Sequence, residues 1–251
     1  LFMDGRKTAV VTGATSGIGK ASAIALARAG YNVVFCGRRR DRLAETEAAC
    51  ASGDVLGVAC DVTGEQAVID LFAQARNRFG RIDVVFNNAG LSSPAAGIDE
   101  TRLEDFQAAV NLNLTGAFLV AREAFRHMRA QDPQGGRIIN NGSISAHVPR
   151  PHAVPYNTTK SAINGLTKTI SLEGRPFNIA CGQIDIGNTG TDMTAAMASG
   201  KLQADFSMAP EPTFDVRHVA DTIVYMAGLP LDANAQSVTI MATSMPYVGR
   251  G

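Results

Sequence analysis

The stretch Thr8-Ala-Val-Val-Thr-Gly-Ala-Thr-Ser-Gly-Ile-Gly19 decides the fold of this 251-residue chain. It begins as a β-branched apolar run, the pattern of a buried parallel strand, and leads into an Ala-rich helix. At the turn between them Gly13 permits a sharp bend, Gly17 lets the backbone approach a pyrophosphate, and Gly19 lets helix and strand pack closely. Free N–H groups and the helix dipole then hold the anion, so the stretch predicts a dinucleotide site.

Outward from this stretch, apolar strands and amphipathic helices alternate along the chain. Strands are expected near 8–12, 31–36, 54–60, 82–87, 136–142, 178–183 and 237–242, and helices near 17–29, 39–51, 64–79, 103–131, 156–172 and 216–227. The alternation predicts one α/β domain over residues 1–251, a Rossmann-type doubly wound parallel sheet with helices on both faces. The irregular segment 187–215 follows a strand end, where ligands bind, and we expect a substrate-binding lid there; an ordinary surface insertion is the alternative.

Charge and composition exclude several classes of partner. Acidic and basic residues balance to a net charge of zero, so we expect neither nucleic acid nor a membrane as partner. No apolar run reaches the about 20 residues that span a bilayer, and we expect no signal peptide. The four cysteines lie on or beside predicted core elements, which favours core thiols and a reducing, cytoplasmic location. No ligand cluster has metal-binding spacing, so no metal site is predicted.

A second group of residues, farther along the chain, carries the chemistry. Tyr156 and Lys160 are spaced to share one helix face, one turn apart. A nearby ammonium favours the phenolate, so we expect the pKa of Tyr156 to fall from its ordinary value of about 10. Ser143 follows an apolar strand, where its hydroxyl can hold a carbonyl or alcohol oxygen. Together they can move a proton on and off that oxygen; a half-buried Tyr over a solvated Lys is the alternative.

Six motifs in one order extend this pattern. They are Thr12-Gly-x-x-x-Gly-Ile-Gly19, Asp61-Val62, Asn87-Asn-Ala-Gly90, Asn113-Leu-Thr-Gly116, Ser143 and Tyr156-x-x-x-Lys160. In these motifs the chain resembles the short-chain dehydrogenase/reductase family, of the classical type, over about residues 7–193. The resemblance implies that Tyr156 is the acid/base and that Ser143 orients the substrate oxygen. It also implies that Lys160 lowers the pKa of the phenol and holds ribose hydroxyls, and that Asn113 keeps a water in the proton relay.

The end of the second strand favours one nicotinamide cofactor. An NAD site usually carries an acid there, but here Gly37 is followed by Arg38, whose guanidinium can bind a 2′-phosphate. We therefore expect NADP, with NAD as the alternative, and interpret Arg39 and Arg40 as a solvated helix start. The predicted cofactor-binding residues are Gly13, Thr15, Ser16, Gly17, Ile18, Gly19, Arg38, Asp61, Val62, Asn88, Ala89, Gly90, Tyr156, Lys160, Ile186 and Thr189.

After the sixth strand the chain departs from the family's pattern. Ile and Asp at 184–185 stand where most relatives have Pro-Gly, and Thr189 takes the place of a threonine beside the carboxamide, with Thr191 as its rival. His147 and His152 lie in a loop that lines the substrate cleft in this family, so either could touch substrate. These departures leave the substrate, the direction and the stereochemistry open.

The expected function is an NADP(H)-dependent oxidoreductase that interconverts a secondary alcohol and a ketone or aldehyde in a small molecule, with tyrosine acid/base catalysis. One alternative is a sensor that binds NADP(H) without turnover. The other is an epimerase or lyase on the same scaffold. Net consumption of cofactor with a carbonyl substrate separates these three functions.

The long helix expected at 103–131 predicts a homotetramer or homodimer. One stripe, assigned to the core, consists of Leu103, Phe106, Val110, Leu114, Phe118, Ala121 and Phe125. Leu112, Leu119 and Val120 fall outside it, and the helix at 156–172 is also apolar on more than one side. In the family the second apolar face packs against the same helices of another subunit; burial by neighbouring loops is the alternative.

Overall fold

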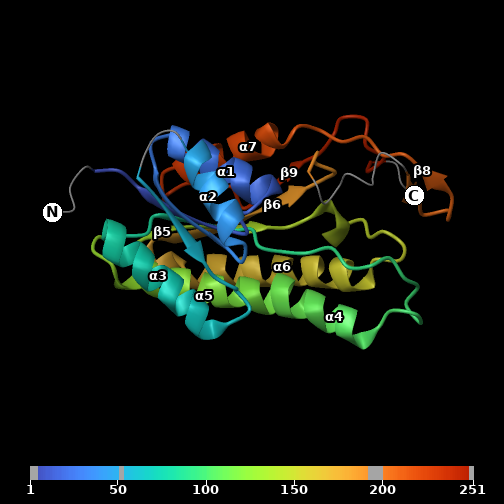
Figure 1. The fold of residues 1–251 in the computed structure, drawn as a ribbon, viewed down its shortest axis with the longest axis horizontal. Coiled ribbons are helices and arrows are strands. Elements are labelled where there is room, and N and C mark those ends of the chain that lie inside the picture. Colours follow the sequence, from blue (N-terminus) through green and yellow to red (C-terminus); the bar gives the residue numbers. More distant parts are fainter. Residues whose placement is uncertain (1–4, 51–53, 192–199, 249–251) are drawn as a thin grey trace.

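The computed structural model describes residues 5–50, 54–191 and 200–248, which form three layers (Figure 1). The central layer is a seven-stranded sheet in the order β3-β2-β1-β4-β5-β6-β9. Its strands are β1 (Thr8–Thr12), β2 (Asn32–Gly37), β3 (Val55–Ala59), β4 (Val84–Asn87), β5 (Gly136–Asn141), β6 (Ile179–Ile186) and β9 (Ser237–Ile240). All six neighbouring pairs are parallel and the order reverses between β1 and β4, which confirms the predicted doubly wound sheet.

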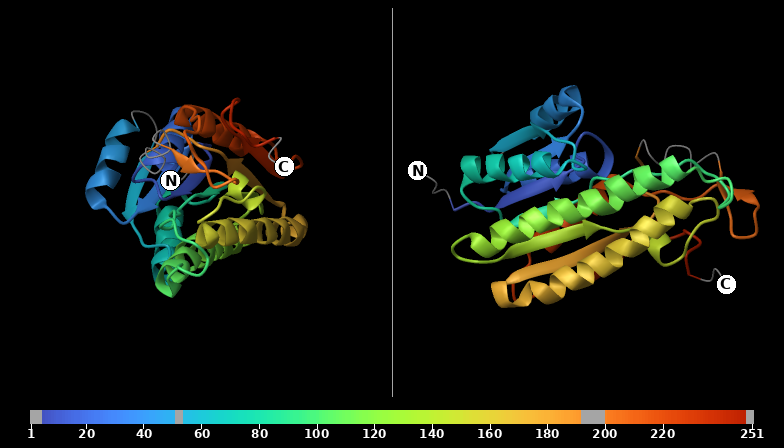
Figure 2. Two further views of the ribbon diagram at one scale, coloured as in Figure 1. Left: turned by 90° about the vertical axis from the view of Figure 1, so that its right-hand side faces the viewer. Right: turned by 90° about the horizontal axis from the view of Figure 1, so that it is seen from below.

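Helices cover both faces of the sheet (Figure 2). One face carries α1 (Gly17–Arg28), α2 (Arg40–Ala49) and α7 (Val216–Gly228); the other carries α3 (Glu65–Phe79), α5 (Ala117–Ala130) and α6 (Val154–Glu173). Val10 packs in the core under α3 and α5, whereas its neighbours Ala9 and Val11 pack in the core under α1 and α7. A strand with two covered faces needs apolar residues on both sides, which explains the unbroken apolar run that opens the chain.

A π-helical stretch between α4 (Leu103–Ala109) and α5 changes which side of the long helix faces the core. The segment α4 continues through this stretch (Val110–Gly116) into α5. The predicted faces are wrong in part: Leu119 and Val120 are buried in the core, whereas Leu103 and Phe118 are 70% and 45% exposed. Ala121 is buried in the core, as predicted. A π turn holds more residues than an α turn, so positions beyond it are rotated away from a stripe drawn at a period of 3.6.

The carboxyl ends of the parallel strands meet at one edge of the sheet. The segment predicted as a lid, 187–215, departs from this edge after β6. Its described parts include a small antiparallel hairpin of β7 (Lys201–Leu202) and β8 (Met208–Ala209). Residues 192–199 of the segment, among them Met193 at the end of the family resemblance, lie outside the described residues.

Candidate active site

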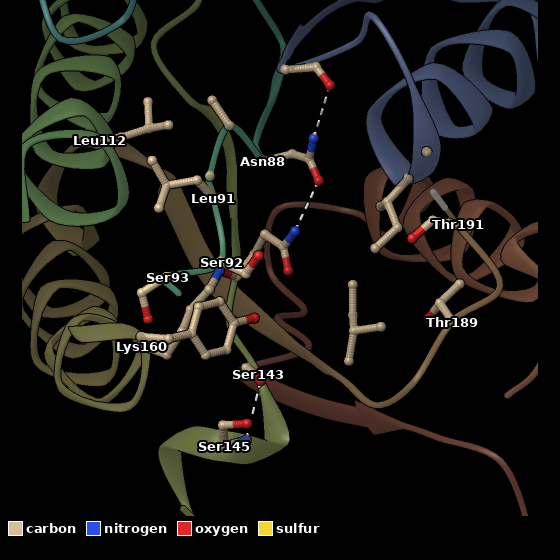
Figure 3. Close-up of a pocket in the computed structure, with 18 of the residues that line it drawn as sticks. Asn88, Leu91, Ser92, Ser93, Leu112, Ser143, Ser145, Lys160, Thr189 and Thr191 are labelled. Atoms are coloured by element: carbon tan, nitrogen blue, oxygen red, sulfur yellow. Dashed lines mark hydrogen bonds between the residues drawn. The ribbon is translucent and has the colours of Figure 1, made fainter. Parts of the chain in front are cut away.

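A cavity of about 790 Å³ opens at the carboxyl edge of the sheet. This volume lies within the range of about 300–1,000 Å³ that is typical of ligand pockets. Every residue predicted to bind the cofactor or to act in catalysis lines the cavity except Asn113. Figure 3 shows Ser143 and Lys160 on one side of the cavity, across from Thr189 and Thr191. The fold thus brings together side chains that are far apart in the sequence.

The glycine turn after β1 has the geometry that its sequence predicts. Gly13 and Gly17 have φ angles of +69° and +52°, in the left-handed region that favours glycine. A Cβ on Gly19 would lie 2.3 Å from the carbonyl oxygen of Gly13, so a side chain there would force α1 away from the turn. The result is bare backbone at the start of a 12-residue helix, which suits the pyrophosphate of a dinucleotide.

A chain of amide hydrogen bonds joins this turn to the next two strands (Figure 3). The backbone N–H of Asn88 donates to Thr12 Oγ1 at 2.9 Å, and its Nδ2 donates to the Thr12 carbonyl at 2.8 Å. Asn141 Nδ2 in turn donates to Asn88 Oδ1 at 2.8 Å. These bonds fix the ends of β1, β4 and β5 relative to one another, and hence the glycine turn relative to the strand that precedes Ser143.

Two arginines lie at the end of the cavity beside β2. The exposed guanidinium of Arg38 has its Nη1 3.9 Å from Asp61 Oδ2. Arg39 Nη2 donates to Thr15 Oγ1 at 3.0 Å and to Ser16 Oγ at 3.2 Å, and Arg39 lines the cavity. The expectation that Arg39 is only a solvated helix start is therefore wrong, since its side chain is bonded to the glycine turn.

The packing of Thr15 against Gly37 explains why the end of β2 carries no acid. A Cβ on Gly37 would lie 2.4 Å from Thr15 Cγ2, so Thr15 fills the space that a carboxylate side chain would need. Asp61 lies beside Arg38 and has a lowered pKa: burial raises it, but hydrogen bonds from Thr63 and the charge of Arg38 outweigh burial. Arg40 begins α2 and is exposed, as expected.

Tyr156 and Lys160 lie one turn apart in α6, as predicted. Lys160 Nζ is 5.7 Å from the centre of the Tyr156 ring and donates to the Asn141 carbonyl at 2.8 Å. Burial lowers the pKa of Lys160 to about 8, partly offset by the negative charge of Asp185. A solvated Lys beside a half-buried Tyr is therefore excluded, because Lys160 is 6% exposed.

The pKa of Tyr156 differs from the expectation. Burial raises it above its ordinary value, and a hydrogen bond with Ser143 and the charge of Arg150 lower it by less. The predicted fall of this pKa is wrong in the free protein, because desolvation disfavours the phenolate more strongly than its neighbours favour it. Tyr156 is thus a neutral phenol near neutral pH, a state suited to donating a proton.

Asn113 has a different position from the other predicted site residues. It lies in the π-helical stretch, and its Oδ1 accepts from the Leu91 N–H at 2.8 Å. Its Nδ2 donates to the Leu91 carbonyl at 3.0 Å and to Thr159 Oγ1 at 3.2 Å. The side chain therefore fastens the loop after β4 to α6. Its role in a proton relay stays a prediction.

The segment around the end of β6 is placed differently from what the family alignment predicts. Residues 184–185 lie inside β6 and pair with β9, so they are not the pair that follows the strand. The first residues past the strand are Gly187 and Asn188. Thr189 and Thr191 both line the cavity, and Thr191 Cγ2 lies 3.4 Å from where a Cβ on Gly17 would be.

A largely buried ion pair between the loop before α6 and the segment after β6 was not predicted. Arg150 Nη2 donates to Glu211 Oε2 at 2.5 Å and to Asn188 Oδ1 at 3.1 Å. Burial raises the pKa of Glu211, but hydrogen bonds from Arg150 and Asn188 lower it to about 2. The partners belong to no common motif, so no local signal could have joined them.

The two loop histidines have different surroundings. His152 lines the cavity, and its ring contacts Phe206 edge-on with centroids 6.0 Å apart. His147 does not line the cavity; its Nε2 lies 2.9 Å from Asp185 Oδ2. Only His152 is thus placed where a substrate could touch it, and His147 instead covers a buried acid.

Comparison with known proteins identifies the family of this chain. A family model described as short chain dehydrogenase matches residues 7–202. The chain belongs to the short-chain dehydrogenase/reductase family.

Relatives within the family act on varied substrates. The chain is 36% identical to a 3beta-hydroxysteroid dehydrogenase of Mediterraneibacter gnavus, over 77% of this chain and 71% of that protein. It is 35% identical to a 3-oxoacyl-[acyl-carrier-protein] reductase of Synechocystis, over 90% and 91%. Among solved structures, NAD⁺-bound xylitol dehydrogenase superposes with a TM-score of 0.84 at 28% identity, covering 94% of this chain and 97% of that one.

Family membership establishes the general reaction. The chain is an NAD(P)-dependent oxidoreductase acting on substrates of the alcohol and ketone type. In the part of the chain that the structure describes, no group of three or more His, Cys, Asp and Glu side chains could hold a metal ion. The helices within that part are all too short or too polar to cross a bilayer.

Proposed function

We propose that this chain is an NADP(H)-dependent oxidoreductase that interconverts a secondary alcohol and a ketone or aldehyde in a small molecule. The observation that carries the proposal is the placement of Ser143, Tyr156 and Lys160 on one wall of the cavity that the glycine turn also lines. The nicotinamide supplies or accepts a hydride when bound. The chain's own residues position the substrate oxygen and move its proton.

Each of the three side chains has a distinct task in this proposal. In reduction Tyr156 donates its phenolic proton to the carbonyl oxygen, for which its raised pKa keeps it protonated. Ser143 holds and polarises the same oxygen. Lys160 is charged below its pKa of about 8 and favours the phenolate that remains after proton transfer. Its buried position keeps that charge out of bulk water, where it would be screened.

The proposed preference for NADP is supported by the residues that line the cavity beside the end of β2. Thr15 occupies the space that the side chain of an acid at position 37 would need, and Arg38 and Arg39 both line the cavity. A 2′-phosphate is well suited to such a pair, because guanidinium binds phosphate oxygens with strong charge-assisted hydrogen bonds. The hydroxyls of Thr15 and Ser16 hold Arg39 close to the turn.

A turnover screen tests the proposed function. The purified protein is incubated with NADPH or NADH and a panel of sugars, ketoacids, steroid-like ketones and acyl ketones, and oxidation of the reduced nicotinamide is followed by absorbance. Consumption of NADPH with one substrate class supports the proposal. Tight NADPH binding without consumption across the panel would favour a sensor, and substrate conversion without net consumption would favour an epimerase or lyase.

We also propose that the described parts of segment 187–215 act as a substrate lid. Lys201, Leu202 and Met208 of the hairpin line the same cavity as the catalytic side chains. The bond between Arg150 and Glu211 ties this segment to the loop before α6. Such a cover would exclude water from the reacting groups and strengthen their electrostatic interactions.

A homodimer or homotetramer is proposed from the apolar groups left uncovered in the single subunit. Phe118 and Leu103 on the α4–α5 helix are 45% and 70% exposed, and Leu172 on α6 is 59% exposed. We expect light scattering to give two or four times the 26.3 kDa of one chain. Phe118→Lys should lower the assembled mass, whereas Tyr225→Lys, on the opposite face, should leave a dimer intact. A stable wild-type monomer in dilute solution would contradict the proposal.

A reducing compartment, the cytoplasm, is proposed from the cysteines. All four, Cys36, Cys50, Cys60 and Cys181, are buried free thiols. Disulfides are common in oxidising compartments and rare in the cytosol, so a set of unpaired thiols fits a cytoplasmic protein.

A further inference from the structure

We propose that Asp185 is a positioning residue of the active site: its buried carboxylate fixes the backbone of Ser143, and so sets where the Ser143 hydroxyl meets the substrate oxygen. The inference rests on the proposed function, in which Ser143 holds that oxygen. It adds a residue from the interior of β6 that does not itself line the cavity.

The carboxylate is held by donors on three sides. Asp185 is 0% exposed, and its Oδ1 accepts from the Ser143 N–H at 3.0 Å and from Gln183 Nε2 at 2.6 Å. Its Oδ2 lies 2.9 Å from His147 Nε2. A buried carboxylate is costly unless it is fully hydrogen-bonded, so this set of donors holds the group in one place. The Ser143 amide is one of those donors.

The backbone next to Ser143 packs closely against the carboxylate of Asp185. A Cβ on Gly142 would lie 2.1 Å from Asp185 Oδ1, so the carboxylate packs directly against the main chain. The Gly142 N–H also donates to the Ile184 carbonyl at 2.8 Å. A displacement of β6 at Asp185 is therefore passed to Ser143 through two adjacent hydrogen bonds.

The remaining polar atoms of Ser143 depend on that backbone position. Its carbonyl accepts from the Ala146 N–H at 3.0 Å, and its Oγ accepts from the Ser145 N–H at 3.1 Å. These bonds start the 3₁₀ turn at Ile144–Ala146 and hold the hydroxyl in place. A hydrogen bond with this hydroxyl lowers the pKa of Tyr156, although burial raises it by more. Loss of the Asp185 contact should thus weaken the bond between Ser143 and Tyr156.

The test compares Asp185→Ala with Asp83→Ala as matched control. Asp83 likewise accepts a backbone N–H, from Thr8 at 2.8 Å, and a side-chain donor, from Arg81 at 2.7 Å, but at the opposite end of the sheet. We expect Asp185→Ala to lower kcat about tenfold through misplacement of the oxygen-binding group. Folded Asp83→Ala should keep the wild-type kcat, whatever its loss of thermal stability.

A second readout does not depend on turnover. The chain has four tyrosines and no tryptophan, so phenolate absorbance is easily followed on titration with base. After subtraction of the Tyr156→Phe spectrum, the phenolate of Tyr156 should form at higher pH in Asp185→Ala than in wild type, and at the wild-type pH in Asp83→Ala. An unshifted titration in folded Asp185→Ala would overturn the inference. A wild type without turnover would instead refute the proposed function while this titration still tests Asp185.

The variant Asp185→Asn separates hydrogen bonding from charge. Its Oδ1 can still accept from Ser143 and Gln183, and its Nδ2 can donate to His147. We expect a wild-type phenolate titration. The kcat should be near that of wild type at pH values where Lys160 stays charged, and should fall at a lower pH than in wild type because the charge of Asp185 raises the pKa of Lys160. If Asp185→Ala does not fold, a tenfold fall of kcat in folded Asp185→Asn with an unshifted titration would show that Asp185 does not act through Ser143. The charged or titratable groups that face the carboxylate are His147 from the loop and Lys160 from α6.

Discussion

Replacing Tyr156 by phenylalanine is expected to lower kcat by about 10²–10⁴-fold, because general acid–base catalysis contributes about that factor. The affinity for the cofactor should stay near the wild-type value, since the substitution removes one hydroxyl and no positive charge. Phenylalanine keeps the ring that packs beside Lys160, whose Nζ lies 5.7 Å from the ring centre. The loss should therefore fall on the chemical step.

The proposed roles of Tyr156 and Lys160 also predict that the rate of carbonyl reduction falls as the pH rises. Carbonyl reduction requires the neutral phenol, which persists until the pH rises through the raised pKa of Tyr156. Lys160 loses its charge earlier, as the pH rises through about 8. We therefore expect the rate of reduction by wild type to fall first near that pH. The residual rate of reduction by Tyr156→Phe should not fall again at higher pH, because this variant has no phenol at position 156 to lose its proton.

Steady-state kinetics and cofactor titration check this prediction together. Tyr225→Phe is the matched control, because Tyr225 is 63% exposed on α7, on the other face of the sheet from α6. It should retain wild-type kcat. If Tyr156→Phe also retained most of its kcat, the proton would have to come from another group, and the assignment of Tyr156 would be wrong.

The fold was largely predictable because its signals are local. The glycine turn, the apolar strand before it and the regular alternation of strands and helices each depend on residues close in sequence, and the sheet order confirms them. The faces of the long helix were not predictable from a fixed period. The π-helical stretch Val110–Gly116 rotates the next turns of the helix, so that Phe118 points out and Leu119 in.

In the candidate site, too, the features with local sequence signals were predicted and the others were not. Residues that belong to motifs, such as Ser143, Tyr156 and Lys160, lie around one cavity as predicted. Contacts made by tertiary packing were missed: Arg39 with the glycine turn, and Arg150 with Glu211, which lies 61 residues away in the sequence. The pKa of Tyr156 was missed for a related reason. The direction of the pKa shift depends on whether the effect of burial exceeds the effect of nearby charges, and spacing along a helix does not reveal this.

Arg38 and Arg39 should together determine which nicotinamide cofactor binds, under the proposed preference for NADP. Both residues line the cavity beside β2. A charge-assisted contact to a phosphate contributes about 1.5–3 kcal/mol, or roughly 10–150-fold in affinity. Arg38→Asp replaces attraction of the 2′-phosphate by repulsion. Arg39→Asp does the same and also removes the bonds to Thr15 and Ser16.

We expect each of these two variants to raise the ratio of the Kd for NADP to the Kd for NAD by roughly 10–150-fold, chiefly by weakening NADP. Fluorescence titration with both cofactors measures the ratio, and a smaller effect at high salt is expected because both groups are exposed. Arg40→Asp makes the same change of charge one residue farther on, outside the cavity lining, and should alter the ratio little. A wild type that already binds NAD more tightly, or an equal shift in Arg40→Asp, would contradict recognition of a 2′-phosphate by these arginines: the first because no phosphate site would exist, the second because the effect would belong to net charge rather than to position.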